Sequence, residues 1–239
     1  MKKTAVIFIC ILALAAAANA DIYVKTKMHQ DAYSIMGQSQ PAEDSIAEQW
    51  IGKDQVAMIQ EKTGFIVDLK KNVMFMINHA EKTYVQSELP LDMSKLFPPE
   101  MAGMLKGMLK MSVSVTPGGQ TKTIGRWKCQ NYTVDIDMMM PIKMTVWATT
   151  DVPFDLNAYV ENMQVNMLAA QFNLDPKAIA EMKKIRGFWI ASETVVDMMG
   201  SKMRSTTEVV EIAEKNPPAG VYSVPAGYTK KDFISMQGR

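Results

Sequence analysis

Residues 45–89, SIAEQWIGKDQVAMIQEKTGFIVDLKKNVMFMINHAEKTYVQSEL, decide the predicted fold of this chain. Short runs rich in apolar and β-branched residues alternate here with tight polar turns such as Gly52-Lys53-Asp54. Connections this short suit antiparallel hairpins, because a parallel crossover needs roughly a dozen residues or more. The stretch therefore predicts an antiparallel meander with strands over Ser45–Ile51, Gln55–Gln60, Phe65–Leu69, Val73–His79 and Thr83–Leu89.

Strand patterns continue on both sides of this meander. Alternation of apolar and polar residues over 21–36 predicts a first strand with one wet face. Further alternation over 111–150 predicts strands on either side of residues 117–119, Pro-Gly-Gly, which are expected to form a turn. A pair of strands over 188–212 and a short edge strand at 221–224 complete the prediction.

Three segments show helical spacing instead. The first covers 93–109, the second begins at the N-cap candidate Asp155, and the third begins at Asp175 with Pro176 in its first turn. The apolar stripes of the first two contain Met101, Met104, Leu105, Met108, Met163 and Met167. These helices are expected to cover the apolar face of the sheet, which makes the predicted fold class α+β.

The amino-terminal residues have the pattern of a signal peptide. A lysine pair at 2–3 precedes an apolar run over 5–18, and Ala-Asn-Ala at 18–20 is a cleavage signal. Cys10 lies inside the apolar run and not after the cleavage site, which argues against a lipid anchor. We expect a cleaved signal peptide over 1–20 and one exported domain over 21–239, located in a bacterial periplasm, with full secretion as the alternative.

Net charge and cysteine content argue against a nucleic-acid partner and against an intrachain disulfide. Loss of the two leader lysines takes the formal net charge from +1 to −1, which gives no reason to expect nucleic acid as a partner. Export also leaves Cys129 as the one cysteine of the chain, so no intrachain disulfide can form. We interpret Cys129 as a small buried hydrophobe, with a reactive thiol or a dimer bridge as alternatives.

No catalytic motif is found, so the chain is predicted not to be an enzyme and to carry no cofactor. His29 and His79 belong to no metal-spaced motif, and nothing would orient either of them beside Cys129 as a nucleophile pair. Asp135 and Asp137 share a strand face, but alternation with apolar neighbours makes that face a solvated one.

Several segments resemble, in their order along the chain, a family of exported bacterial proteins defined only as a domain of unknown function. The matching segments are Trp50–Asp54, Ile66–Asp68, Asn78-His79 leading to Lys82-Thr83-Tyr84, Cys129 with Tyr132, Val146-Trp147 before Thr150-Asp151, and Tyr222–Tyr228. That family is similar in architecture to the lipoprotein-localisation carriers LolA and LolB. The resemblance implies a curved antiparallel half-barrel whose concave face is covered by helices and holds acyl chains. It transfers no individual ligand-contacting residue.

We therefore expect an exported, non-catalytic binding protein for a hydrophobic ligand, such as an acyl chain, a lipid or a lipidated protein segment. Methionine, of which the chain has 22, adapts to ligands of different shape. Transient contact with a membrane surface fits this function, and the oligomeric state stays open. The candidate residues of the groove are Trp50, Phe75 and Trp147 on the sheet, Met104, Leu105 and Met108 on one helix, and Met163 and Met167 on another.

Two other functions are compatible with the same pattern. One is a structural or interaction module of the cell envelope with a filled core and no ligand. The other is Cu(I) binding by thioethers, for which residues 101–108 and 138–140 supply methionine clusters. No His or Cys accompanies either cluster, and methionine on apolar stripes is usually packing.

The processing prediction is tested by the intact mass of protein purified from the cell envelope. We expect a chain that begins at Asp21 and carries no acyl group, because Ala-Asn-Ala at 18–20 is the cleavage signal. A mass that includes residues 1–20, or one increased by lipid, would contradict the prediction.

Overall fold

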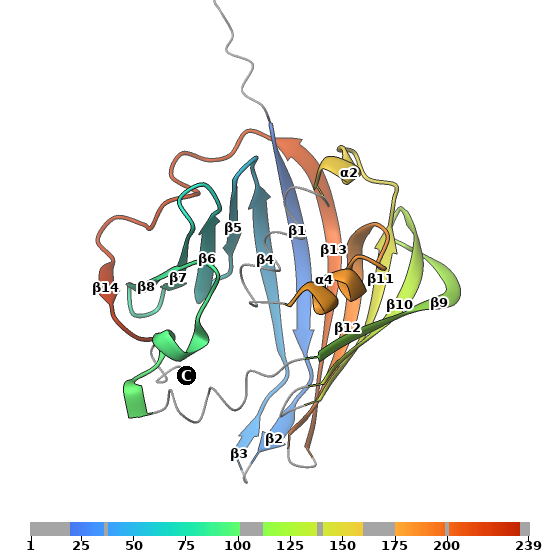
Figure 1. Ribbon diagram of the computed structural model, residues 1–239, viewed down its shortest axis with the longest axis horizontal. Helices are drawn as coiled ribbons and strands as arrows, with labels where there is room; N and C mark the ends of the chain where they lie inside the picture. Colours follow the sequence, from blue (N-terminus) through green and yellow to red (C-terminus); the bar gives the residue numbers. More distant parts are fainter. Residues whose placement is uncertain are drawn as a thin grey trace, which may run out of the picture.

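A computed structural model describes residues 20–35, 38–100, 112–137, 141–159, 175–198 and 201–234. Most of these residues form one large open sheet, whose strands fan out from β14 and β8 at one side to β9 at the other (Figure 1). The sheet is mixed, because β14 runs parallel to β8 while the other neighbours are antiparallel. No helix among the described residues is long and apolar enough to cross a membrane.

The predicted meander over residues 45–89 is present. It consists of β4 (Glu43–Ile51), β5 (Gln55–Ile59), β6 (Thr63–Asp68), β7 (Val73–Asn78) and β8 (Thr83–Glu88), each antiparallel to the next. Asp68 shows how its turns are fixed: the carboxylate accepts hydrogen bonds from the Lys71 backbone N–H at 2.9 Å and from Gln55 at 2.8 Å.

A second meander forms the other half of the sheet. Its strands are β9 (Ser112–Ile124), β10 (Trp127–Asp137), β11 (Ile142–Thr149), β12 (Phe188–Met198) and β13 (Ser201–Lys215). The predicted turn at Pro117-Gly118-Gly119 is wrong, because β9 passes through these residues and only its pairing with β10 is irregular there. Asn131 accounts for this, since its side-chain oxygen accepts the Gln120 N–H at 3.0 Å and its side chain occupies the space that a Cβ at Gly118 would need.

The first strand joins the two meanders. β1 (Asp21–Gln30) pairs with β4 along one edge, from Ile22↔Ile51 to Gln30↔Glu43. Along its other edge it pairs with β13, from Asp21↔Lys215 to Gln30↔Ser205. The predicted single strand over 21–36 is shorter here, and a separate small hairpin of β2 (Tyr33–Ile35) and β3 (Gln38–Gln40) follows it.

The helical prediction fails in its main point. The fold class of helices covering a concave sheet face is wrong for the described chain, which is mostly strand. The helical elements there are short: η1 (Met93–Leu96), α2 (Leu156–Tyr159) and α4 (Pro176–Met182). Among the described residues, loops pack against the main core cluster, α4 packs against a second cluster and the carboxy-terminal segment against a third, without a broad helical layer.

The carboxy-terminal segment covers one apolar cluster. Tyr23, Trp50 and Ile66 belong to it, and Val221, Tyr222 and Tyr228 pack against it from the end of the chain. The edge strand expected at 221–224 is wrong, because these residues form turns and the edge strand is β14 (Thr229–Lys231). The Tyr222 hydroxyl donates to Asp21 Oδ2 at 2.6 Å, and Tyr228 Oη lies 2.8 Å from His79 Nδ1.

The central position of β1 yields a test at Val24, which is 1% exposed in the main core cluster. Val24→Asn buries an amide without partners, which destabilises a core by about 3–5 kcal/mol and lowers the melting temperature of a chain this size by ~10 °C. The control is Lys27→Asn at an exposed position of the same strand, where a shift below about 2 °C is expected.

Circular dichroism and tryptophan fluorescence should report the same transition in both variants. Trp50 lies in one meander and Trp127 in the other, so their signals follow both halves of the sheet. Two separate transitions would contradict a sheet held together through β1.

Candidate functional site

Trp50 and Phe75 were expected to share one ligand groove with Trp147. Trp50 is 6% exposed, and its ring centroid lies 4.8 Å from that of Tyr23. The ring centroids of Phe75 and Tyr84 are 6.2 Å apart. Trp50 and Phe75 both belong to the cluster that the carboxy-terminal segment covers. Trp147 instead packs against the main core cluster, with Lys122 Nζ 4.1 Å from its ring centroid. The structure thus brings two of the three together and places the third elsewhere.

The other predicted groove residues lie outside the described part of the chain. These are Met104, Leu105, Met108, Met163 and Met167, and the same holds for the methionines at 138–140. Among the residues that are described, no group of three or more His, Cys, Asp or Glu side chains could hold a metal ion.

Cys129 is buried as expected, with 1% of its surface exposed. Its thiol donates to the Trp127 carbonyl at 3.6 Å, and burial raises the pKa of the thiol. A thiol of this kind is a packing group at neutral pH, because the thiolate is the reactive form.

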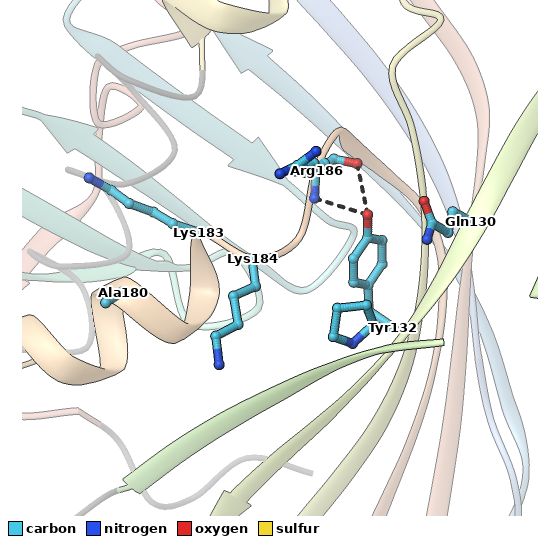
Figure 2. Close-up of a pocket in the computed structure, with 7 residues that line it drawn as sticks. Gln130, Tyr132, Ala180, Lys183, Lys184 and Arg186 are labelled. Carbon is cyan, nitrogen blue, oxygen red and sulfur yellow. Dashed lines mark hydrogen bonds between the residues drawn. The ribbon is translucent and has the colours of Figure 1, made fainter. Parts of the chain in front are cut away.

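A pocket of about 510 Å³ opens between α4 and the strands β9 and β10 (Figure 2). Three parts of the chain line it: β9 with one residue, β10 with two residues, and the end of α4 together with the residues that follow it. The lining residues are Pro117, Gln130, Tyr132, Ala180, Lys183, Lys184 and Arg186.

The helix that forms one side of the pocket is fixed at both ends. Asp175 is its N-cap, and the carboxylate accepts the Ala178 N–H at 2.7 Å, with Pro176 in the first turn. Ala178 and Ile185 are buried against side chains of β9, β10 and β11 such as Val134. A helix this short is marginal alone, so this packing is what holds it.

Tyr132 connects the strands to the chain after the helix. It is 2% exposed, and its hydroxyl accepts the Arg186 N–H at 3.2 Å and donates to the Arg186 carbonyl at 3.5 Å. Figure 2 shows the tyrosine ring reaching from β10 toward this backbone. The ring position and the segment 183–186 are therefore set by the same contact.

Glu181 holds the helix against the free edge of β9. One carboxylate oxygen accepts the Val115 N–H at 2.9 Å, and the other lies 2.6 Å from Lys184 Nζ. These bonds, that to Lys184 first, hold the pKa of Glu181 below its usual value. Pro117, two residues on, has no N–H, so these two positions offer little to a strand from another chain.

The side chains that line the pocket offer apolar contact and positive charge. The Tyr132 ring, Pro117 and Ala180 are apolar, while Lys183, Lys184 and Arg186 bring cations to the rim. The Tyr132 hydroxyl is already bonded to the Arg186 backbone, so it is not placed to transfer a proton. This lining is suited to binding and contains no pair of nucleophile and base.

Sequence reasoning missed this pocket. Tyr132 was named only beside Cys129 in the family resemblance, and the basic run KKIR at 183–186 was given no role. A basic run directly after a short helix is a signal in retrospect, but the partner strand lies some fifty positions earlier and no local pattern connects them.

A family model described as "Domain of unknown function (DUF4412)" matches residues 22–228 of this chain. Among solved structures, those of PNGF-II in space groups C2 and P21 are similar, with 13% and 14% sequence identity and TM-scores of 0.39 and 0.40. Each match covers 89% of this chain but only 31% of the PNGF-II chain, so this chain spans about a third of that length. No curated protein matches the sequence significantly.

Gly187 directly follows the pocket residue Arg186, has φ +118°, and has no room for a Cβ because the Thr149 carbonyl oxygen occupies that space. We expect Gly187→Ala to lower the free energy of unfolding by about 2–4 kcal/mol, from left-handed backbone strain plus overpacking. Gly220→Ala is the matched control, because its φ is +82° but nothing lies within 4 Å, and it should lose only about 1–2 kcal/mol. Equal losses in urea unfolding would show that the contact with Thr149 is unimportant.

Proposed function

This chain belongs to the family described as domain of unknown function DUF4412, and we propose that it is a non-catalytic binding protein for a hydrophobic ligand. The ligand class is an acyl chain, a lipid or a lipidated protein segment. The proposed site is the pocket between α4 and the strands β9 and β10, which replaces the groove expected from the sequence.

The observation that carries this proposal is the pocket itself. Its volume of about 510 Å³ lies within the roughly 300–1,000 Å³ that small-molecule sites occupy. The exposed ring of Pro117 and the exposed methyl group of Ala180 form its apolar side, and the Tyr132 ring also lines it with only 2% of its surface exposed. Burial of a ligand methylene against such a surface contributes about 0.8 kcal/mol, so an alkyl chain needs few polar contacts.

Preorganisation supports the proposal. The Tyr132 ring is held by its two hydrogen bonds to the Arg186 backbone, and α4 by its N-cap and by Glu181. Side chains already fixed in this way lose little freedom when a ligand arrives, which favours binding.

The proposed location of the protein is the periplasm. The signal-peptide pattern over 1–20 motivates a periplasmic location, with secretion as the alternative, and transient contact with a membrane surface would give access to lipid. The likeness to the lipoprotein-localisation carriers LolA and LolB, inferred from sequence, motivates acyl chains as the ligand class and nothing finer.

The test uses a neutral fluorescent lipid, methyl cis-parinarate, in direct titration. Ala180→Trp places an indole in the pocket from an exposed position of α4 and should weaken binding at least about tenfold, because the space for the chain is filled. Lys177→Trp is the matched control, since it adds the same indole to the same helix at an exposed residue that does not line the pocket.

Unchanged affinity in Ala180→Trp would move the site elsewhere and contradict the proposal. Failure of the unmodified protein to bind the probe, together with its purification free of lipid, would favour the structural module. Thermal melts of both variants are the check that the fold is retained.

A further inference from the structure

We infer that the ligand of this pocket is an anionic amphiphile, a single alkyl chain that ends in a carboxylate or phosphate group. The inference rests on the proposed function. It adds the charge of the ligand and the residues that bind the charged group. Arg186 and Lys183 are the residues that contact the anionic group.

The charges around the pocket are unbalanced. Three of its lining side chains are cations, and none is an acid. Glu181 lies beside them, but its two oxygens already bind Lys184 Nζ and the Val115 N–H. Within the described residues, Lys183 and Arg186 have no ion pair, so both positive charges remain for a ligand.

The two cations start from fixed points of the backbone. Both bonds of the Tyr132 hydroxyl go to the Arg186 backbone, and Lys183 is the C-cap residue of α4. In Figure 2 Arg186 lies near the Tyr132 hydroxyl, the Lys183 side chain extends away from the tyrosine, and the Lys184 side chain extends in a third direction. Both Lys183 and Arg186 are exposed and line the pocket, and we take them as the pair that meets one anionic group.

The chemistry of these side chains defines the anion. A guanidinium group matches a carboxylate or a phosphate with two parallel hydrogen bonds, and an ammonium group adds a point charge. The apolar side of the pocket receives the alkyl chain next to the head group. A neutral lipid would gain only the contact between its alkyl chain and the apolar side of the pocket.

The experiment compares two probes with the same chain, cis-parinaric acid and its methyl ester. The unmodified protein should bind the acid about tenfold more tightly than the ester, as a charge-assisted hydrogen bond predicts. Lys183→Gln combined with Arg186→Gln should bring this ratio close to one by weakening the acid, with the ester unaffected.

The matched control removes two exposed lysines that do not line the pocket, by Lys53→Gln and Lys177→Gln, and should keep the ratio. A salt titration of the unmodified protein is independent of any mutation. At about 1 M salt, where charges are screened beyond about 3 Å, the preference for the acid should shrink while ester binding persists.

The outcomes separate the two proposals. Equal affinities for acid and ester, or a preference untouched by the double substitution, would overturn the inference and leave hydrophobic binding intact. Binding of neither probe would overturn both. Competition by dodecyl phosphate against cis-parinaric acid is expected for a free single-chain anion. Sedimentation with phosphatidylglycerol vesicles without uptake of either probe would instead show recognition of a bilayer and would also overturn the inference.

Discussion

Backbone pairing along both edges of β1 is the constraint on which the rest of the structure depends. In the strand order of the described sheet, the meander β4–β8 and the meander β9–β13 are joined through this strand, because its two neighbours are β4 and β13. Side chains of β1 such as Val24 lie in the main core cluster with residues of both halves, for example Val67 and Ile190. Strand pairing and apolar burial therefore act at the same place, and each half is stabilised by the other.

The pocket is a local product of this arrangement. Strand β10 fixes the Tyr132 ring, the ring fixes the backbone at Arg186, and Gly187 lets the chain turn back into β12 against Thr149. The edge strand β9 completes the site, and Glu181 both binds its edge and balances one of the neighbouring lysines. Contacts that protect the sheet edge and contacts that shape the pocket are thus partly the same, so a substitution at Glu181 would affect both.

Much of the strand structure could be predicted from alternation and turn residues, because these are local properties, and the meander over 45–89 shows this best. The pairing of distant strands could not be predicted, because the alternation in β1 does not reveal that β13 lies beside it. Pro117-Gly118-Gly119 reads as a turn until the side chain of Asn131 is placed next to it. The pocket joins a tyrosine to a helix far along the chain, and the short α4 is held by packing that sequence periodicity does not contain. Helices with strong apolar spacing were expected to cover the sheet, whereas in the described residues the three core clusters are packed by loops, by the short α2 and α4, and by the carboxy-terminal segment.

The pairing of β1 with β13 also orders events during synthesis. Asp21 is among the first residues of the sheet to be made, and its partner Lys215 is among the last. Until β13 has been translated, one edge of β1 has no neighbour, although β4–β8 can already form by local hairpins. A sheet with such distant pairing has high contact order, so it folds slowly and exposes an open edge to other chains in the meantime. The sheet therefore stays incomplete, and its open edge stays accessible to chaperones, until β13 has been translated.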